Sequence, residues 1–575
     1  MPSTRARGSA ASAEIETDVL VAGGGPCGLM LANELGRRGV RCLVVDAKPG
    51  TAFNPQANAT QARTMEHFRR LGFADEIRAL GLPADHPTDI AYFTHFAGHE
   101  LARLRLPTAA EAARRVRALG GSWSAAELPH RVSQKFVEAT LRRHAEALPS
   151  VELRYGSTLL SFEDRDDAVE ATLRPTDGGT QSRVVARYLV GADGARSTVR
   201  RALGIAWGGA TGVQRDFMGG RMFAVYLRAP GLYAAIPHAR AWMHVAVNAR
   251  RRAFMAAVDG RGEFAFHAAV HPGEDADAWS DRDARRVFAE ALGVEVPIEV
   301  LSVGTWTAGH SLVAERFGTG RVFIAGDAAH LFTPTGGLGY NTAVEDAVNL
   351  GWKLAAALRG SGGATLLASY ERERRPVAER NTAYARRFAD SVGLFAASPE
   401  LEATGAAGDA ERARAGAYLE AHAKLEFDIP GVTFGARYDG SPVIVGDGSV
   451  APPDEPNRYV PSACPGGRAP HAWLDDGASL FDRFGFEWTL LALGESAPST
   501  AGFEVSAAGL GIDLRVVRET SPALRDLYAA PLALVRPDQI VAWRGECASD
   551  AAAVLAAATG CARVPDVTRP SRPTR

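Results

Sequence analysis

The sequence predicts an α/β fold of several domains, and three observations indicate it. A valine-rich apolar run at 18–22 leads into a glycine-rich turn and then a helical pattern, the order that parallel sheets use. Two later apolar runs, 187–190 and 321–325, end in the same way on glycine and aspartate. Beyond residue 438 the chain changes to short strands and turns, which indicates a separate C-terminal domain. At 575 residues the chain is too long for one core, and length alone favours roughly two to four domains.

Composition argues against several classes of partner. Hydrophobic residues make up 46% of the chain and charged residues 23%, which is ordinary for a globular protein. The formal net charge of −2 argues against nucleic acid or an anionic membrane surface as the main partner. No run approaches the roughly 20 apolar residues of a membrane span. The five cysteines form no C-x-x-C pair, so we expect no disulfide framework and no metal site, and a reducing cytoplasm fits best.

The first motif predicts a dinucleotide site. The strand at 18–22 runs into Gly23-Gly24-Gly25-Pro26-Cys27-Gly28, and the helical pattern follows over 29–38. Gly23 permits the tight turn, Gly25 lets a pyrophosphate approach the backbone, and Gly28 lets helix and strand pack closely. Asp46 ends the next buried strand, 18 residues past Gly28, where it can accept hydrogen bonds from ribose hydroxyls. This unit does not by itself decide between FAD and NAD.

Two later motifs carry a family resemblance. The strand at 187–190 leads into Gly191-Ala192-Asp193-Gly194, and the strand at 321–325 leads into Gly326-Asp327. Pro334-Thr-Gly-Gly-Leu-Gly-Tyr-Asn341 follows, before a helical pattern from Thr342 to about Leu358. With these motifs in this order, the sequence resembles the class A flavoprotein monooxygenases, the family of para-hydroxybenzoate and phenol hydroxylases, over about residues 17–390.

The resemblance implies FAD as cofactor. Asp327 should hold a ribitol hydroxyl, and the backbone of 336–341 should lie against the isoalloxazine ring, with Pro334 and Gly337 facing flavin and substrate in the catalytic loop. The helix after this loop would point its positive end at the flavin. The cofactor-binding residues that the resemblance implies are Gly23, Gly25, Pro26, Cys27, Gly28, Asp46, Ala47, Gln56, Arg63, Gln134, Asp193, Gly194, Gly326, Asp327, Pro334, Gly336, Gly337, Leu338, Gly339 and Asn341.

One segment departs from the family pattern. Where the family often reads Pro-Arg-Ala, this chain has Pro55-Gln56-Ala57, so the arginine that helps hold FAD and nicotinamide nucleotide is replaced by Gln56. Arg63 either takes over part of that work or is a solvated helix residue, and the sequence does not separate these alternatives. The choice between NADPH and NADH is therefore open.

The resemblance also predicts the domain plan. It gives a discontinuous Rossmann-like (GR2-type) FAD-binding domain at 17–90, 126–204 and 315–395, interleaved with a β-sheet substrate domain at 91–125 and 205–314. Residues 396–433 are read as a helical connector, and 434–565 resemble the thioredoxin-like C-terminal domain of the phenol- and polyketide-hydroxylase branch. Because that domain lacks C-x-x-C, we expect a structural or dimerisation role, and a homodimer is one candidate assembly.

The implied activity is monooxygenation of an aromatic substrate. NADPH or NADH would reduce FAD, O2 would form a flavin C4a-hydroperoxide, and one oxygen atom would pass to a phenolic or polycyclic aromatic ring. Baeyer–Villiger or oxidative-decarboxylation chemistry on the same scaffold, and FAD-dependent dehydrogenation, are alternatives that the motifs do not separate. No general base is assigned: we expect core or surface roles for His95, Tyr226, His238 and His244, and a packing role for His330.

Overall fold

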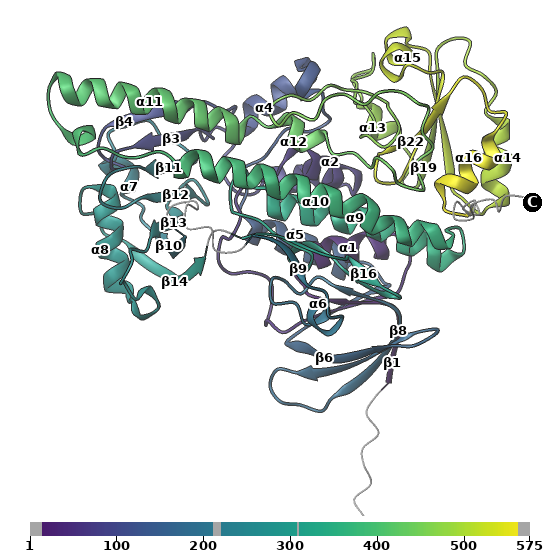
Figure 1. The fold of residues 1–575 in the computed structure, drawn as a ribbon, viewed down its shortest axis with the longest axis horizontal. Helices are drawn as coiled ribbons and strands as arrows, with labels where there is room; N and C mark the ends of the chain where they lie inside the picture. The colour runs from purple at the N-terminus through teal and green to yellow at the C-terminus, as the bar shows by residue number, and fades with distance from the viewer. Residues whose placement is uncertain (1–13, 211–219, 308–309, 562–575) are drawn as a thin grey trace, which may run out of the picture. The chain divides into compact units, whose positions relative to one another are not determined.

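The computed structural model describes residues 14–210, 220–307 and 310–561 and forms two compact units (Figure 1). The first unit comprises the described residues through Gly351, together with Arg375–Phe434 and Asp454–Tyr459. The second comprises Trp352–Arg374, Gly435–Pro453 and the described residues from Val460 onward. The division falls within the two long helices α9 (Leu338–Arg359) and α10 (Ala364–Gly393).

A mostly parallel sheet forms the centre of the first unit. Its strand order is β16-β17-β8-β1-β2-β5, and the strands from β17 to β5 are parallel. The hairpin β6–β7 adds to it through an antiparallel pair with β8. Residues 19–22 of β1 are buried, as expected for a strand covered on both faces. The strands are β1 (Glu14–Ala22), β2 (Cys42–Asp46), β5 (Val151–Tyr155), β6 (Ser157–Asp164), β7 (Val169–Pro175), β8 (Ser182–Gly191), β16 (Gly318–Thr319) and β17 (Val322–Ile324).

A second, mostly antiparallel sheet lies in the same unit, with the order β14-β10-β13-β12-β11-β3-β4. Helices α8 (Asp281–Leu292) and α11 (Ala406–Phe427) contribute to its apolar core, and α11 packs along β3 and β4 (Figure 1). A small third sheet has the order β18-β15-β9. The strands are β3 (Ile90–Phe93), β4 (Glu100–Leu104), β9 (Trp207–Ala210), β10 (Arg221–Arg228), β11 (Met243–Ala246), β12 (Ala253–Ala257), β13 (Glu263–Ala269), β14 (Glu299–Thr307), β15 (Ser311–Ala314) and β18 (His330–Leu331).

Short helices complete the first unit. Helix α1 follows β1, and α5 packs against it. The helices of this unit, apart from α8 to α11, are α1 (Pro26–Gly36), α2 (Ala62–Arg70), α3 (Ala74–Arg78), α4 (Ala109–Arg115), α5 (Gln134–Glu146), α6 (Thr198–Ala202), α7 (Leu232–Ala235) and α12 (Pro430–Phe434), with a 3-10 turn η5 at Gly326–Ala328.

The second unit carries a four-stranded sheet in the order β20-β19-β21-β22. Strands β19 and β20 are parallel, whereas β21 and β22 are antiparallel to their neighbours. This is the strand order and direction of a thioredoxin-like sheet, and it confirms the predicted fold class. The elements are α13 (Leu480–Arg483), β19 (Trp488–Leu493), α14 (Ala501–Gly509), β20 (Leu514–Glu519), α15 (Pro522–Tyr528), β21 (Leu532–Val535), β22 (Val541–Gly545) and α16 (Ala551–Ala558).

Two features differ from the sequence-based expectation. Helix α9 begins at Leu338 rather than Thr342, so the last residues of the glycine-rich loop already form its first turn. Residues 396–433 do more than connect, because α11 covers part of the antiparallel sheet. Among the described residues, no helix is both long and apolar enough to cross a bilayer.

Candidate active site

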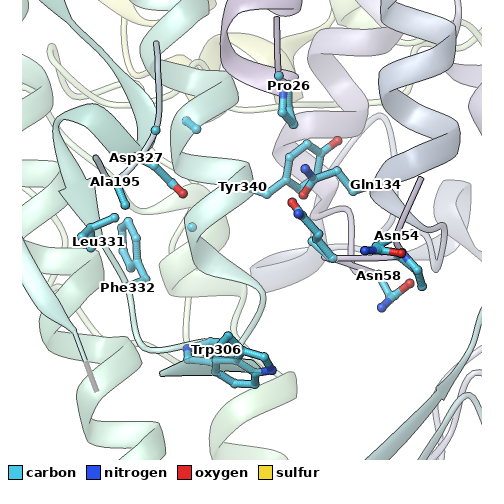
Figure 2. A pocket seen from close by; sticks show the side chains of 18 of the residues that line it. Pro26, Asn54, Asn58, Gln134, Ala195, Trp306, Asp327, Leu331, Phe332 and Tyr340 are labelled. Atoms are coloured by element: carbon cyan, nitrogen blue, oxygen red, sulfur yellow. The ribbon is translucent and has the colours of Figure 1, made fainter. Parts of the chain in front are cut away.

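One cavity of about 1230 Å³ lies within the first unit. Cavities that hold one drug-sized ligand usually measure about 300–1000 Å³, so this space has room for more than one such ligand. Its walls come from the ends of β1 and β2, the loop 54–59, the glycine-rich loop before α9 and one face of the antiparallel sheet. Figure 2 shows Pro26 and Asp327 on one side of this space and Trp306 on the opposite side.

The turn between β1 and α1 has the geometry that its glycines predict. Gly23 has φ +113°, and a Cβ there would lie 2.1 Å from the carbonyl oxygen of Ala192. A Cβ on Gly28 would lie 1.9 Å from the carbonyl oxygen of Gly23, so helix and strand approach as closely as backbone permits. Gly25 lines the cavity, and a Cβ there would meet no protein atom within 4 Å. The open space at Gly25 lies at the positive end of α1, where an anionic group is stabilised.

Asp46 is oriented by two backbone amides. Its Oδ2 accepts a hydrogen bond from the Gly24 amide at 2.8 Å, and its Oδ1 accepts one from the Lys48 amide at 2.8 Å. The Tyr155 hydroxyl donates to the Gly24 carbonyl oxygen at 3.1 Å and fixes the same turn. The carboxylate lines the cavity and keeps lone pairs free for ribose hydroxyls.

Asp327 faces the cavity from the 3-10 turn that follows β17. Its side chain is accessible from within the cavity, yet the surrounding protein desolvates the carboxylate and raises its pKa, an effect that the charge of His330 opposes. His330 does not line the cavity; its Nε2 is 2.6 Å from Asp346 Oδ2, and that oxygen also accepts from the Gly326 amide at 3.1 Å. This buried pair supports the turn that presents Asp327, which agrees with the packing role expected for His330.

The glycine-rich loop 334–341, hereafter the ring loop, is held from two sides. Gly336 and Gly337 have φ of +62° and +66°, values that favour glycine. The Gly336 amide donates to Glu426 Oε1 at 2.9 Å, and the Gln61 side-chain amide donates to the Gly336 carbonyl oxygen at 2.8 Å. The Asn341 side chain accepts a hydrogen bond at Oδ1 from the backbone amide of Gln61 at 2.9 Å, and its Nδ2 donates to the Gly337 carbonyl oxygen at 2.6 Å. The backbone that faces the cavity is therefore fixed by side chains from behind.

Glu426 was not predicted from the sequence as a site residue. It lies on α11, pairs with His422 at 2.9 Å one turn earlier, and is 5% exposed. The His422 Nδ1 in turn is 3.1 Å from the Ser391 hydroxyl. Helix α11 thus supplies a buried carboxylate to the ring loop, and both Glu426 and His422 line the cavity.

The antiparallel sheet gives the cavity an aromatic end. Trp306 Nε1 donates to His267 Nδ1 at 3.0 Å, and the His267 ring is stacked on Phe254 with centroids 4.5 Å apart. The aromatic residues that line the cavity, beyond the predicted site, are Tyr92, Trp207, Tyr226, Trp242, Phe254, Trp306, Phe332, Tyr340 and Phe427. A flat apolar ring system would be desolvated and stacked there.

Most predicted site residues meet in this cavity. The residues that line it are Gly23, Gly25, Pro26, Cys27, Asp46, Ala47, Gln56, Gln134, Asp193, Gly194, Asp327, Pro334, Gly336, Gly337, Leu338 and Gly339. Gly28, Gly326 and Asn341 stand behind the wall, in the contacts described above. Arg63 is buried and pairs with Glu66 at 3.0 Å, so it is neither a solvated helix residue nor a wall residue.

Of the four residues considered as general bases, Tyr226 lines the cavity and the three histidines do not. Tyr226 lines the cavity, and its hydroxyl bonds Lys135 and the Glu263 carboxylate; burial and the Glu263 hydrogen bond raise its pKa, so it stays a phenol. His95 pairs with Glu402 at 2.7 Å, and His238 bonds the Gly98 carbonyl oxygen at 2.5 Å. His244 is 0% exposed in the apolar core.

The cavity fits FAD on the chemistry of its walls. Asp193 Oδ1 and Asn58 Oδ1 are buried acceptors to which no described residue donates a hydrogen bond. The Asp193 Oδ2 is already used, since it accepts from the Thr198 amide at 2.7 Å. The open backbone at Gly25, the carboxylates of Asp46 and Asp327 and the ring loop together offer the kinds of contact that a flavin dinucleotide requires.

Comparison with known proteins gives the same result. The family model described as "FAD binding domain" matches residues 16–385, and the one described as "Aromatic-ring hydroxylase, C-terminal" matches residues 462–562. The chain belongs to the class A flavoprotein monooxygenases, the FAD-dependent aromatic-ring hydroxylases. FAD is therefore its cofactor, as the family resemblance had implied.

Individual relatives span nearly the whole chain. The aklavinone 12-hydroxylase RdmE of Streptomyces purpurascens is 34% identical over 571 residues, covering 94% of this chain and 97% of its own. The rebeccamycin biosynthetic enzyme RebC, solved with reduced flavin, has a TM-score of 0.85 and 36% identity, covering 96% of this chain and 100% of its own. An aklavinone-11 hydroxylase solved with FAD and aklavinone has a TM-score of 0.77 and 30% identity, covering 95% and 99%.

Proposed function

We propose that this enzyme hydroxylates a polycyclic phenolic substrate, with NADPH or NADH as reductant and O2 as oxygen donor. The observation that carries the proposal is that a single cavity joins the dinucleotide turn and Asp327 to the aromatic wall of the antiparallel sheet. A cofactor and an aromatic substrate bound in this one cavity would meet at the ring loop. Relatives that act on aklavinone support a polycyclic substrate.

The residues that line the cavity would position FAD, and FAD would supply the redox chemistry. FAD, when bound, supplies hydride acceptance and the activation of O2. The protein supplies position: Gly25 and α1 for the diphosphate, Asp46 for the ribose, Asp327 for the ribitol and the ring loop for the flavin ring. These contacts are the roles that we propose for the predicted cofactor-binding residues.

The aromatic end of the cavity would bind the substrate ring system. Phe254 and Trp306 offer flat apolar faces, and burying a ring against them removes water from the reacting face. Exclusion of water is useful in this chemistry, because water and stray protons divert activated oxygen from the substrate. The match of the C-terminal region to aromatic-ring hydroxylases favours ring hydroxylation over Baeyer–Villiger insertion.

The test is oxidation of NADPH and of NADH by the purified yellow protein, followed with O2 uptake across a panel of simple and polycyclic phenols. We expect a polycyclic phenol to accelerate NAD(P)H oxidation and to consume O2 with it. The Asp327→Ala variant, assayed without added FAD, serves as a flavin-poor control that should lose both signals. Oxidation that no aromatic compound accelerates would contradict the proposal.

A further inference from the structure

His267 and Trp306 form a pair on the cavity face of the antiparallel sheet. His267 lies on β13 and Trp306 on β14, and β10 runs between these strands. Ala224 of β10 is the partner of His267 in the register, and Met222, two residues earlier on the same face, is the partner of Trp306. The indole therefore reaches across β10 to the imidazole, where the small Ala224 side chain leaves room.

The direction of this hydrogen bond fixes the proton on His267. An indole nitrogen can only donate, so Trp306 Nε1 donates and His267 Nδ1 accepts over their 3.0 Å separation. A nitrogen that accepts carries no proton. The neutral imidazole must then carry its proton on Nε2.

The surroundings keep the ring neutral. A charged imidazolium would carry a proton on both nitrogens, and its Nδ1–H would face the indole N–H donor to donor. The ring is also stacked on Phe254 with an interplanar angle of 17°. Burial lowers the pKa of His267 to about 4, which agrees with this geometry.

The remaining nitrogen faces the cavity. His267 lines the cavity and is half-buried, and its Nε2 has no acceptor among the residues that the structure describes. The neighbouring wall residues are Ala224, Phe254 and Trp306, which offer no acceptor side chain. This Nε2–H is therefore available to donate to an acceptor oxygen of a ligand bound against the aromatic wall.

We propose that His267 is a substrate-binding hydrogen-bond donor, which presents Nε2–H to a quinone or ketone oxygen of the aromatic substrate, and that Trp306 is the positioning residue that holds it in this tautomer. The inference rests on the proposed function and deepens it, because it assigns a carbonyl oxygen to the ring system that binds at this wall. It also assigns His267 no role as a general base, since Nδ1 is occupied and Nε2 is already protonated.

The tautomer is measured directly, without substrate. The holoenzyme, labelled with nitrogen-15 in histidine, is examined by two-bond nitrogen–proton correlation NMR, and the His267 signals are assigned by their loss in His267→Gln. We expect an unprotonated Nδ1 and a protonated Nε2 in the wild type, and a mixture of tautomers in Trp306→Phe. A protonated Nδ1 in the wild type would overturn the inference, whatever the enzyme proves to catalyse.

The donor role is measured by binding to the holoenzyme. The probes are a dihydroxyanthraquinone and the dihydroxyanthracene of the same substitution pattern, which differ by the quinone oxygens. His267→Phe should bind the quinone between about twofold and tenfold more weakly, the value of one neutral hydrogen bond, and the anthracene with unchanged affinity. His267→Gln should restore quinone binding, because its amide can accept from Trp306 and still donate to the ligand.

The binding results distinguish failure of the His267 donor role from failure of the proposed function. Equal quinone affinity in the wild type and His267→Phe would overturn the donor role and leave the aromatic substrate class intact. Failure of every aromatic probe to bind a wild-type enzyme with full flavin content would instead contradict the proposed function, on which the donor role depends.

Discussion

Replacing Asp327 should weaken FAD binding by a measurable and graded amount. The carboxylate faces the cavity, and among the described residues none donates a hydrogen bond to it, so its substitution removes a contact to ligand rather than one within the protein. Hydrogen bonds to charged groups contribute about 1.5–3 kcal/mol, which corresponds to an increase in Kd of about tenfold to 150-fold for Asp327→Ala. Asp327→Asn keeps a neutral acceptor and should lose roughly half of that free energy.

The assay is titration of flavin-free protein with FAD, followed by quenching of flavin fluorescence. Asp167→Asn is the matched control, because Asp167 is exposed in the turn between β6 and β7 and does not line the cavity. Circular dichroism should show equal folding of all variants. An Asp327→Ala protein that binds FAD within about twofold of wild type would show that the Asp327 carboxylate makes no such contact to FAD.

Three further predictions concern buried ionisable groups. Burial lowers the pKa of His244 to about 3 from about 6.5 when unfolded, so between these values the unfolded state binds a proton that the folded state does not. The contribution of this site to the free energy of unfolding is complete above about pH 6.5 and falls by about 1.4 kcal/mol per pH unit on acidification. Between about pH 7 and pH 5, wild type should therefore lose about 2 kcal/mol more of its free energy of unfolding than His244→Phe, as measured by urea unfolding. Glu426→Ala should speed FAD release by about twofold to tenfold in stopped-flow measurements, and Glu426→Gln, which keeps an acceptor for the ring loop, should not. Glu373→Gln should cost about 3–5 kcal/mol in thermal unfolding, because it removes a fully buried partner of Arg536, whereas the exposed Glu420→Gln should cost at most about 1 kcal/mol.

The parts of the site that the sequence predicted are local in the chain. Gly23 and Asp46 belong to one strand-turn-helix-strand unit, and Asp327 follows directly on a buried strand. In such units the same few residues set the backbone conformation and make the ligand contact. The spacing of these residues in the sequence therefore predicts both. The same holds for the thioredoxin-like sheet, whose strands follow one another closely in the sequence.

The parts that the sequence could not predict depend on long-range packing. Glu426 meets Gly336 across 90 positions, from a helix whose alanine-rich pattern indicated only a connector. His267 and Trp306 meet because two strands flank a third, a register that neither strand encodes alone. Arg63 illustrates the converse, since the sequence left open a cofactor contact or a solvated helix position, and the fold buries the residue beside Glu66.

Aromatic hydroxylation is tested by following isotope-labelled O2 during turnover of a polycyclic phenol with NADPH or NADH. We expect a product that contains one labelled oxygen atom bonded to a ring carbon, formed together with oxidation of one NADPH or NADH. A product that contains no label, or one labelled oxygen inserted between two carbons of a ring, would contradict aromatic hydroxylation by this enzyme.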